Sequence, residues 1–355
     1  MRKLFIAYLL LTSVAIYAQT EVSRYKPGIT QDGAIYYLPK TSIRIDLLIE
    51  KSVYSPGEFC QYAGKYLNNE DVKCESHTLY KIAQIGISSV GIPDTSKCYS
   101  IKLNPKNATT KFVLDDEGIL LAINATPKVI NQQKAFKPAP KPVAINPHKF
   151  MNQDILSAGS TAKMAELAAQ EIYDLRDSRA QLAKGQAEFM PKDGEQLKIM
   201  LQNLDLQESA LTQAFIVTTV KDTTEHIIMY CPDHETAKSL LFRFSSKLGM
   251  LDRDDMAGNP YYISIEDEHF VPQENTLNNG KKKKTENGLF VNIPGKIKAT
   301  LFNGNKMLGS IEIYAGQFGH AECLSTELFN KKYETHLTLN PNTGSVEKLE
   351  TLLQQ

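Results

Sequence analysis

Tryptophan is absent from the 355 residues of this chain, and so is an excess of charge of either sign. The 40 basic side chains balance 40 acidic ones, so the chain lacks the broad positive field with which proteins bind nucleic acids or anionic membranes. Glycan-binding β modules commonly present exposed aromatic platforms, usually led by Trp. We therefore expect no nucleic-acid partner, and a glycan partner would have to be bound by the tyrosines Tyr36, Tyr37, Tyr261 and Tyr262.

Long apolar runs are missing after the first twenty residues, because no later window approaches the roughly 18–20 continuous apolar residues of a membrane helix. The first segment has a basic start at Arg2 and Lys3, an apolar run over 4–14, and the small residue Ala18 before Gln19. This pattern predicts a secretory signal peptide over residues 1–18. The first cysteine is Cys60, so we expect no lipid anchor. The sequence predicts a soluble protein that is periplasmic or secreted.

Cysteine is scarce as well, with five residues in the whole chain. An odd number spread over this length does not form a disulfide framework, so the hydrophobic core must stabilise the fold. A chain of this size buries roughly three quarters of its unfolded surface, which suffices for such a core. One bridge among Cys60, Cys74 and Cys98 stays open in an oxidising compartment.

The N-terminal part is typical of β structure with one short helix. Residues 42–50 alternate Ile or Leu with polar side chains, which predicts a half-buried strand. Ser55-Pro56-Gly57-Glu58 has the composition of a helix start, and we expect that helix to end near Leu67. Further strands are expected over 79–89, 99–103, 110–114 and 119–124, the last two joined as a hairpin.

Five prolines and no acidic residue occupy the segment 126–153, which predicts a linker or an extended strap. Two amphipathic helices follow, over about 160–184 and 193–214, because apolar residues recur at helical spacing in both. Gly185 provides a C-cap and Asp193 an N-cap, so the two helices should fold back as a hairpin. Such a pair cannot bury both apolar stripes alone, and it must therefore dock on a sheet or contact another molecule.

The remainder of the chain returns to strands. We expect them over 214–220 and 225–230 with a turn at Lys221-Asp222, and then over 239–244 and 261–266. The segment 271–288, with the tetralysine Lys281–Lys284, is expected to be an exposed polar loop. A C-terminal β unit then contains hairpins around Asn303-Gly304 and around the turn 340–344.

Two acidic or metal-like motifs deserve comparison with known sites. Cys231-Pro-Asp-His234 offers two ligands of the kind that bind zinc, but a structural site needs four. Asp252, Asp254 and Asp255 before Gly258 resemble a calcium loop, yet Met256 and Ala257 stand where oxygen ligands and the glycine belong. We predict neither a metal nor a cofactor, and the acidic segment is expected to be a turn between strands.

Catalytic arrangements are equally incomplete. Glu171, Asp174 and Asp177 are spaced along one helix, but with Arg176 and Arg179 beside them they indicate ion pairs on a solvated face. Cys323 with His320, or a serine with His226, could contribute to a catalytic triad. The sequence has no nucleophile-elbow motif such as GxSxG, however. No catalytic residue is assigned from the sequence.

Six strings spread over nearly the whole mature chain carry a family resemblance. They are Gly33-Ala-Ile-Tyr-Tyr-Leu-Pro-Lys40, Tyr54-Ser-Pro-Gly-Glu-Phe-Cys60, Gly118-Ile-Leu-Leu-Ala-Ile-Asn124, Gly159-Ser-Thr-Ala-Lys-Met-Ala-Glu166, Phe189-Met-Pro-Lys-Asp-Gly-Glu195, and Ala315-Gly-Gln-Phe-Gly319 with Leu328-Phe-Asn-Lys331. Together they resemble an uncharacterised exported family of Bacteroidetes-type bacteria, domain of unknown function 4831. The resemblance implies export and a β-rich fold, and it supplies no activity, cofactor or catalytic residue.

These observations predict an α+β fold of mostly antiparallel β domains with an inserted or docked two-helix hairpin. The predicted division is a signal peptide 1–18, an N-terminal β-rich domain 19–125, a Pro-rich linker or strap 126–153, a helical hairpin with a β-sheet 154–270, an exposed loop 271–288 and a C-terminal β unit 289–355. We expect a non-enzymatic module for binding or assembly in the cell envelope, with a protein or glycan partner. The alternative is a periplasmic hydrolase acting on glycans or peptides, with a site assembled from scattered side chains.

Overall fold

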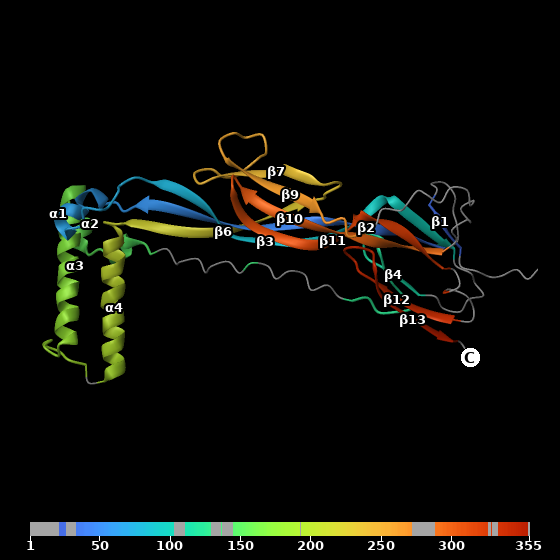
Figure 1. Ribbon diagram of the computed structural model, residues 1–355. Coiled ribbons are helices and arrows are strands. Elements are labelled where there is room, and N and C mark those ends of the chain that lie inside the picture. Colours follow the sequence, from blue (N-terminus) through green and yellow to red (C-terminus); the bar gives the residue numbers. More distant parts are fainter. Residues whose placement is uncertain are drawn as a thin grey trace, which may run out of the picture.

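The computed structural model describes residues 21–25, 33–102, 111–128, 136, 145–191, 193–271, 288–325, 328 and 333–353. The predicted signal peptide 1–18, the tetralysine Lys281–Lys284 and most of the Pro-rich segment 126–153 lie outside these residues, and so those predictions stay untested. Figure 1 shows an elongated molecule with a pair of helices at one end and a small sheet at the other.

The fold is α+β, with three antiparallel sheets and four α-helices over the described ranges, which confirms the predicted class. The strands are β1 (Glu21–Arg24), β2 (Gly33–Pro56), β3 (His77–Lys102), β4 (Phe112–Leu114), β5 (Leu120–Ile123), β6 (Val217–Tyr230), β7 (Thr236–Ser245), β8 (Gly249–Leu251), β9 (Asn259–Asp267), β10 (Gly288–Asn303), β11 (Lys306–Ser325), β12 (Tyr333–Leu339) and β13 (Val346–Leu353). The helices are α1 (Ala63–Leu67), α2 (Gln153–Leu156), α3 (Thr161–Ala183) and α4 (Gly194–Gln213), with 3-10 turns η1 (Cys60–Tyr62) and η2 (Pro147–Phe150).

A long hairpin of β2 and β3 forms the spine of the molecule. The two strands contain 24 and 26 residues, so each extends about 80 Å at the usual rise per residue. They are paired from Gly33–Lys102 at one end to Tyr54–His77 at the other. The strands expected over 42–50, 79–89 and 99–103 are therefore parts of two continuous elements.

Two sheets pack face to face along the middle of this spine. The first has the order β1-β3-β2-β6, and the second has the order β11-β10-β9-β7-β8. Ile43, Ile45, Leu47 and Ile49 of β2 are buried against the second sheet, as their alternation predicts. The second sheet contributes large apolar side chains to the same core, among them Leu241, Phe242, Ile263, Ile265, Ile297 and Leu301.

The third sheet lies at the end of the spine opposite the helices (Figure 1) and has the order β13-β12-β5-β4. Its core contains Tyr36 and Leu38 from β2, Leu120 from β5 and Leu337 from β12, all fully or almost fully buried. Strands from near the start of the chain therefore share a core with strands from its end. The predicted hairpins of β4 with β5 and of β12 with β13 are confirmed.

The helices form a separate unit at the opposite end, which we call the helical head (Figure 1). Ala168, Ile172 and Leu175 of α3 are buried there together with Phe59 and Phe215, which flank the ends of β2 and β6. The predicted caps are confirmed, because Asp193 accepts a backbone hydrogen bond at the start of α4 and Gly185 follows α3 with φ +70°. Ser160, for which no cap was predicted, is the N-cap of α3. A disulfide joins Cys60 to Cys74 within this head.

Two local predictions were wrong, and both for the same reason. The helix expected to begin at Ser55 begins only after residue 59, because Gly57 and Phe59 donate backbone hydrogen bonds to Ile216 and Ala214 and prolong the strand pairing. The turn expected at Lys221-Asp222 lies inside the continuous strand β6, where these residues pair with Ser52 and Lys51. Pairing with a long neighbour overrides the local turn and helix preferences.

Candidate functional site

The zinc-like motif lies in the connection between β6 and β7. Its two candidate ligands, Cys231 and His234, differ in burial. Cys231 is half-buried, and this burial raises the pKa of its thiol in spite of the nearby ammonium group of Lys40. His234 is exposed, and Asp233 forms an ion pair with Lys40 at 3.8 Å. Within the described ranges, no group of three or more His, Cys, Asp or Glu side chains is arranged to hold a metal ion.

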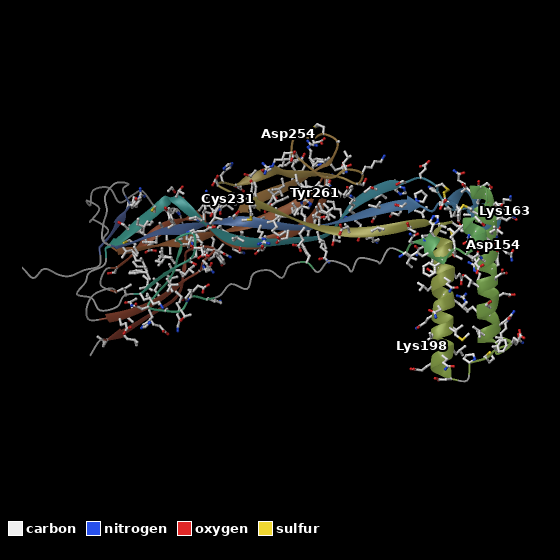
Figure 2. The ribbon with its side chains drawn as sticks, turned by 180° about the vertical axis from the view of Figure 1, so that it is seen from behind. Asp154, Lys163, Lys198, Cys231, Asp254 and Tyr261 are labelled. Carbon is white, nitrogen blue, oxygen red and sulfur yellow. A yellow bond between two sulfur atoms is a disulfide. The ribbon has the colours of Figure 1, made fainter. Side chains whose placement is uncertain are left out.

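The calcium-like segment forms a turn between β8 and β9 that projects from the second sheet, and Asp254 marks it in Figure 2. Two arginine side chains fix this turn. Arg243 donates to the carbonyl oxygens of Arg253 and Gly258, and Arg253 donates to that of Leu241. Asp255 accepts a hydrogen bond from the backbone of Ala257, so its carboxylate also serves the turn itself.

The carboxylates of α3 face separate partners instead of converging on one point. Glu171 accepts from Asn152 at 2.9 Å, and Asp174 accepts from Gln170 at 3.0 Å. The neighbouring arginines cross to α4, where Arg176 pairs with Glu208 and Arg179 with Asp205 and Glu208. In the described residues the arginines thus form ion pairs with carboxylates of α4 and not with the α3 carboxylates predicted as their partners, and these pairs link α3 to α4.

The triad candidates are distributed over two sheets. His320 and Cys323 lie on β11, and the Cys323 thiol contacts the carbonyl oxygen of Leu324 at 3.7 Å. His226 lies on β6 of the first sheet. The structure thus gives no geometric reason to group these side chains.

Of the four tyrosines considered for glycan binding, two belong to cores. Tyr36 is fully buried and exchanges hydrogen bonds with the backbone of Phe290, and burial raises its pKa. Tyr261 stacks on Phe242 with ring centres 4.6 Å apart. Tyr262 stacks on Phe302, and the Lys238 ammonium lies 4.0 Å from the Tyr262 ring centre, so this tyrosine already has two protein partners.

A polar cluster that the sequence did not indicate lies where the three sheets meet. Asn292 of β10 is fully buried, and its amide donates to the carbonyl oxygens of Pro39 and Thr343 at 2.8 Å each. Lys97 of β3 donates to the carbonyl oxygen of the Asn292 side chain at 3.2 Å, and burial lowers the pKa of Lys97. Both polar groups of the Asn292 side chain are thus hydrogen-bonded to other segments of the chain. The cluster therefore has a structural role, which is to join these segments.

A cavity of about 530 Å³ opens at the base of the helical head. Its apolar wall includes Pro56 of β2, Ile145 and Pro147 near η2, and Ile216 before β6. Glu58 and His148 stand at the same cavity and form a hydrogen-bonded pair with 2.9 Å between Oε2 and Nε2. Both side chains are about half exposed, so the pair lies at the solvent-facing opening of the cavity.

The cavity also touches four successive residues of β6, from Val217 to Val220. Successive side chains of a strand point to opposite faces, so a cavity that meets all four lies along the edge of the strand. β6 is the outermost strand on its side of the first sheet. No signal in the sequence predicts this cavity, because it arises from β2, η2, α4 and β6 meeting at one point.

A second exposed feature lies on the far half of the α3–α4 hairpin. In Figure 2, Lys163 marks the end of α3 near the sheets, while Lys198 marks the far end of α4. The helices are connected at that far end, and several apolar side chains there are exposed, including Phe189 at 81% and Ile199 at 56%. We call the exposed residues Phe189, Met190, Ile199 and Met200, together with the exposed Leu206 nearer the base of α4, the hairpin-tip surface.

The comparisons with known proteins identify a family and nothing more specific. The model of a family described as domain of unknown function (DUF4831) matches residues 32–347, which is nearly the whole chain. This match confirms the family resemblance that the sequence strings indicated. No curated protein and no solved structure matches the chain.

Proposed function

Because the chain belongs to this family of domains of unknown function, its role has to be argued from geometry, and we propose that it is an exported, non-enzymatic binding or assembly module of the cell envelope. The hairpin-tip surface carries this proposal. Exposed apolar side chains gathered on an element that projects from the body are typical of a docking surface. The helical head would thus present the partner-binding side chains, and the sheets would hold the head in place.

The incomplete packing of α4 supports the same proposal. Among the residues of α4, only Ala210 and Leu211 at its base are buried, although apolar residues continue to its first turn. In Figure 1 the two helices project steeply from the long sheets, so the sheets do not cover their far half. A third or fourth helical surface from a partner is the usual means of covering such a pair.

The Cys60–Cys74 disulfide supports the export part of the proposal. Structural disulfides form and persist in oxidising compartments and are rare in the cytosol. No helix in the part of the chain that the structure describes combines the length and apolar composition needed to span a membrane. Because the predicted signal peptide ends at Ala18, intact-mass analysis of the protein purified from its host should give an N-terminus at Gln19, and retention of residues 1–18 would contradict export.

Site-specific photo-crosslinking in cells that produce the full chain tests the docking surface. A photoreactive phenylalanine at Ile199 or Met200 should give a crosslink to a defined envelope protein, because both side chains are exposed at the tip. The matched control is Leu248, which is equally exposed, at 57%, but lies in the turn between β7 and β8. Identical crosslinked partners at Leu248, or none at Ile199 and Met200, would contradict the proposal.

Substitutions at the same surface give an independent readout. Ile199→Lys with Leu206→Lys should abolish the crosslink from Met200 while leaving the fold intact, since both side chains are exposed. Leu175, although it belongs to the apolar stripe seen in the sequence, is buried in the head and would unfold it if charged. In the described residues we find no observation that favours the hydrolase alternative, and it is not proposed.

A further inference from the structure

Beside the cavity, the edge of β6 that no described strand pairs with has a specific pattern of main-chain groups. Gly57 donates to the carbonyl oxygen of Ile216, and in the same register Pro56 is opposite Val217. Because hydrogen-bonded and non-bonded pairs alternate in an antiparallel ladder, Ile216, Thr218 and Val220 direct their N–H and C=O groups toward β2. The N–H and C=O groups of Val217, Thr219 and Lys221 then point outward from the sheet.

The cavity lies at an uncharged end of this edge. Sheet edges are usually guarded against pairing with other chains by charged side chains. The middle of β6 has such residues in Lys221, Asp222 and Glu225, all exposed, whereas Val217–Val220 has none. β6 is also uncharged at its other end, Ile227–Tyr230, and the Val217–Val220 end is the one that borders the apolar cavity, which can receive a side chain.

We propose that this cavity is a peptide-binding site, in which an extended segment of a partner protein pairs with Val217, Thr219 and Lys221 of β6 and places an apolar side chain among Pro56, Ile145 and Ile216. The outward N–H and C=O groups bind the peptide main chain whatever its sequence. The cavity selects an apolar side chain, and the Glu58–His148 pair at its border offers polar contacts. This site lies at the base of the head and is distinct from the hairpin-tip surface.

The space beside this end of β6 favours a single peptide strand as the binding partner over a second copy of this chain. α4 stands steeply across the end of β6 where the cavity lies (Figure 1). A second copy that paired its own β6 antiparallel to Val217–Lys221 would carry the rest of that strand past the end of β6, toward the helical head. One extended peptide needs only about 5 Å beside the edge, which is the ordinary spacing between strands.

A proline substitution separates the proposed pairing from the ladder within the sheet. Thr219→Pro removes an outward N–H group and adds a ring at the edge, while the hydrogen bonds from Thr218 and Val220 to β2 stay in place. Thr219→Ala changes the same side chain and keeps the N–H group, so it is the matched control. Circular dichroism and thermal melting of both variants establish that they are folded.

The probe is a phage-displayed library of random twelve-residue peptides, selected on the immobilised full chain. Fluorescently labelled copies of the enriched peptides should bind the wild type and Thr219→Ala with similar Kd, and Thr219→Pro at least about tenfold more weakly. Failure to enrich any peptide would overturn the proposal, as would equal binding to Thr219→Pro. Retention of peptide binding by the Ile199→Lys, Leu206→Lys variant shows that this site is separate from the hairpin tip, and loss of binding in that variant assigns the peptide to the tip and overturns the proposal.

Amide hydrogen exchange on the wild type keeps the proposal testable even if Thr219→Pro does not fold. Bound peptide should slow exchange at Val217, Thr219 and Lys221, whose N–H groups point outward, and change Thr218 and Val220 little, since their N–H groups already bond to β2. Uniform slowing, or slowing elsewhere only, would contradict strand addition. Sedimentation velocity of the protein alone addresses the second copy, because a dimer that Thr219→Pro converts to a monomer would overturn the choice of a peptide.

Discussion

At the scale of single residues, Asn292 shows how one side chain joins three sheets. It lies in β10, holds the backbone of β2 through Pro39, and holds the turn between β12 and β13 through Thr343. Thr41 and Asn342 reinforce the joint, because the Thr41 hydroxyl donates to the Asn342 carbonyl and Asn342 in turn donates to Ser89. Nothing in the local sequence marks Asn292, since its role depends on residues 253 positions away.

Asn292→Ala should lower the free energy of unfolding by about 3 kcal/mol, because two buried carbonyl oxygens and the Lys97 ammonium lose their partner. Chemical denaturation followed by circular dichroism measures the change. Asn203→Ala, an exposed position on α4, is the control and should change stability by less than about 0.5 kcal/mol. Equal stability of the two variants would show that the joint is dispensable.

Glu50 is the residue whose ionisation should make the first sheet sensitive to acid. Burial raises its pKa, but hydrogen bonds from Lys81 and Lys221 outweigh this effect and hold the pKa below its ordinary value of 4.5. The carboxylate thus links β3, β2 and β6 from its place in the middle strand. Since the folded state holds the lower pKa, the stabilisation is complete above the unfolded value and is lost as the pH falls through the folded value.

We expect the stability of the wild type to fall more steeply below about pH 4.5 than that of Glu50→Gln, which lacks this ionisation. At neutral pH the variant should be less stable by about 1 kcal/mol, because two ammonium groups lose their partner. Urea unfolding between neutral and acid pH gives both quantities. Glu225→Gln, exposed on β6 of the same sheet, should follow the wild-type pH dependence, and parallel curves for Glu50→Gln would exclude the assignment.

At the scale of elements, the two long helices α3 and α4 were predictable and the long strands were not. Ser160, Gly185 and Asp193 mark the ends of α3 and α4 by local backbone chemistry, which a sequence displays directly. The pairing of β2 with β3 is irregular next to Pro39, which lies opposite Pro93 of β3. Proline has no N–H group, so neither residue donates a hydrogen bond to the other strand. The strand nevertheless continues, because partners distant in sequence hold both of its halves.

The disulfide gives the helical head its own prediction. Cys60 and Cys74 close a loop of 14 residues between η1 and the start of β3, and such a loop is worth about 3 kcal/mol in restricted chain entropy. Replacing both by Ser should make trypsin cleave at Lys65 and Lys73 about tenfold faster or more, because the segment opens more often. Cys231→Ser, at a free cysteine, should leave the cleavage rate unchanged. Equal rates in both variants would mean that packing alone fixes the segment.

At the scale of the whole molecule, the elongated shape is the property that separates this chain from an ordinary globular protein of its length. The spine strands extend about 80 Å, and Figure 1 places the helical head and the third sheet at opposite ends. The candidate sites follow from this layout, since the cavity exists only where the head joins the edge of the first sheet. Sequence patterns show which side chains share a strand face, but they do not show which segments become neighbours at an end of the molecule.

Small-angle X-ray scattering tests this shape. A compact chain of 355 residues has a radius of gyration of about 20 Å. The spine predicts a value above about 25 Å and a distance distribution with a long tail. A symmetric distribution near 20 Å would mean that the head and the third sheet fold back onto the middle of the spine.

The strands that share a core are synthesised far apart in time, and this affects when the chain can fold. β2 pairs with β6 about 170 positions later, and the Thr41–Asn342 hydrogen bond joins residues 301 positions apart. The cores along β2 therefore cannot close until nearly the last residue has been synthesised, and such long-range pairing makes folding slow. A chain that is to be threaded through a membrane must stay unfolded while it waits. If the chain is exported as proposed, this topology would favour the unfolded state during that wait, since the N-terminal half has no completed core of its own.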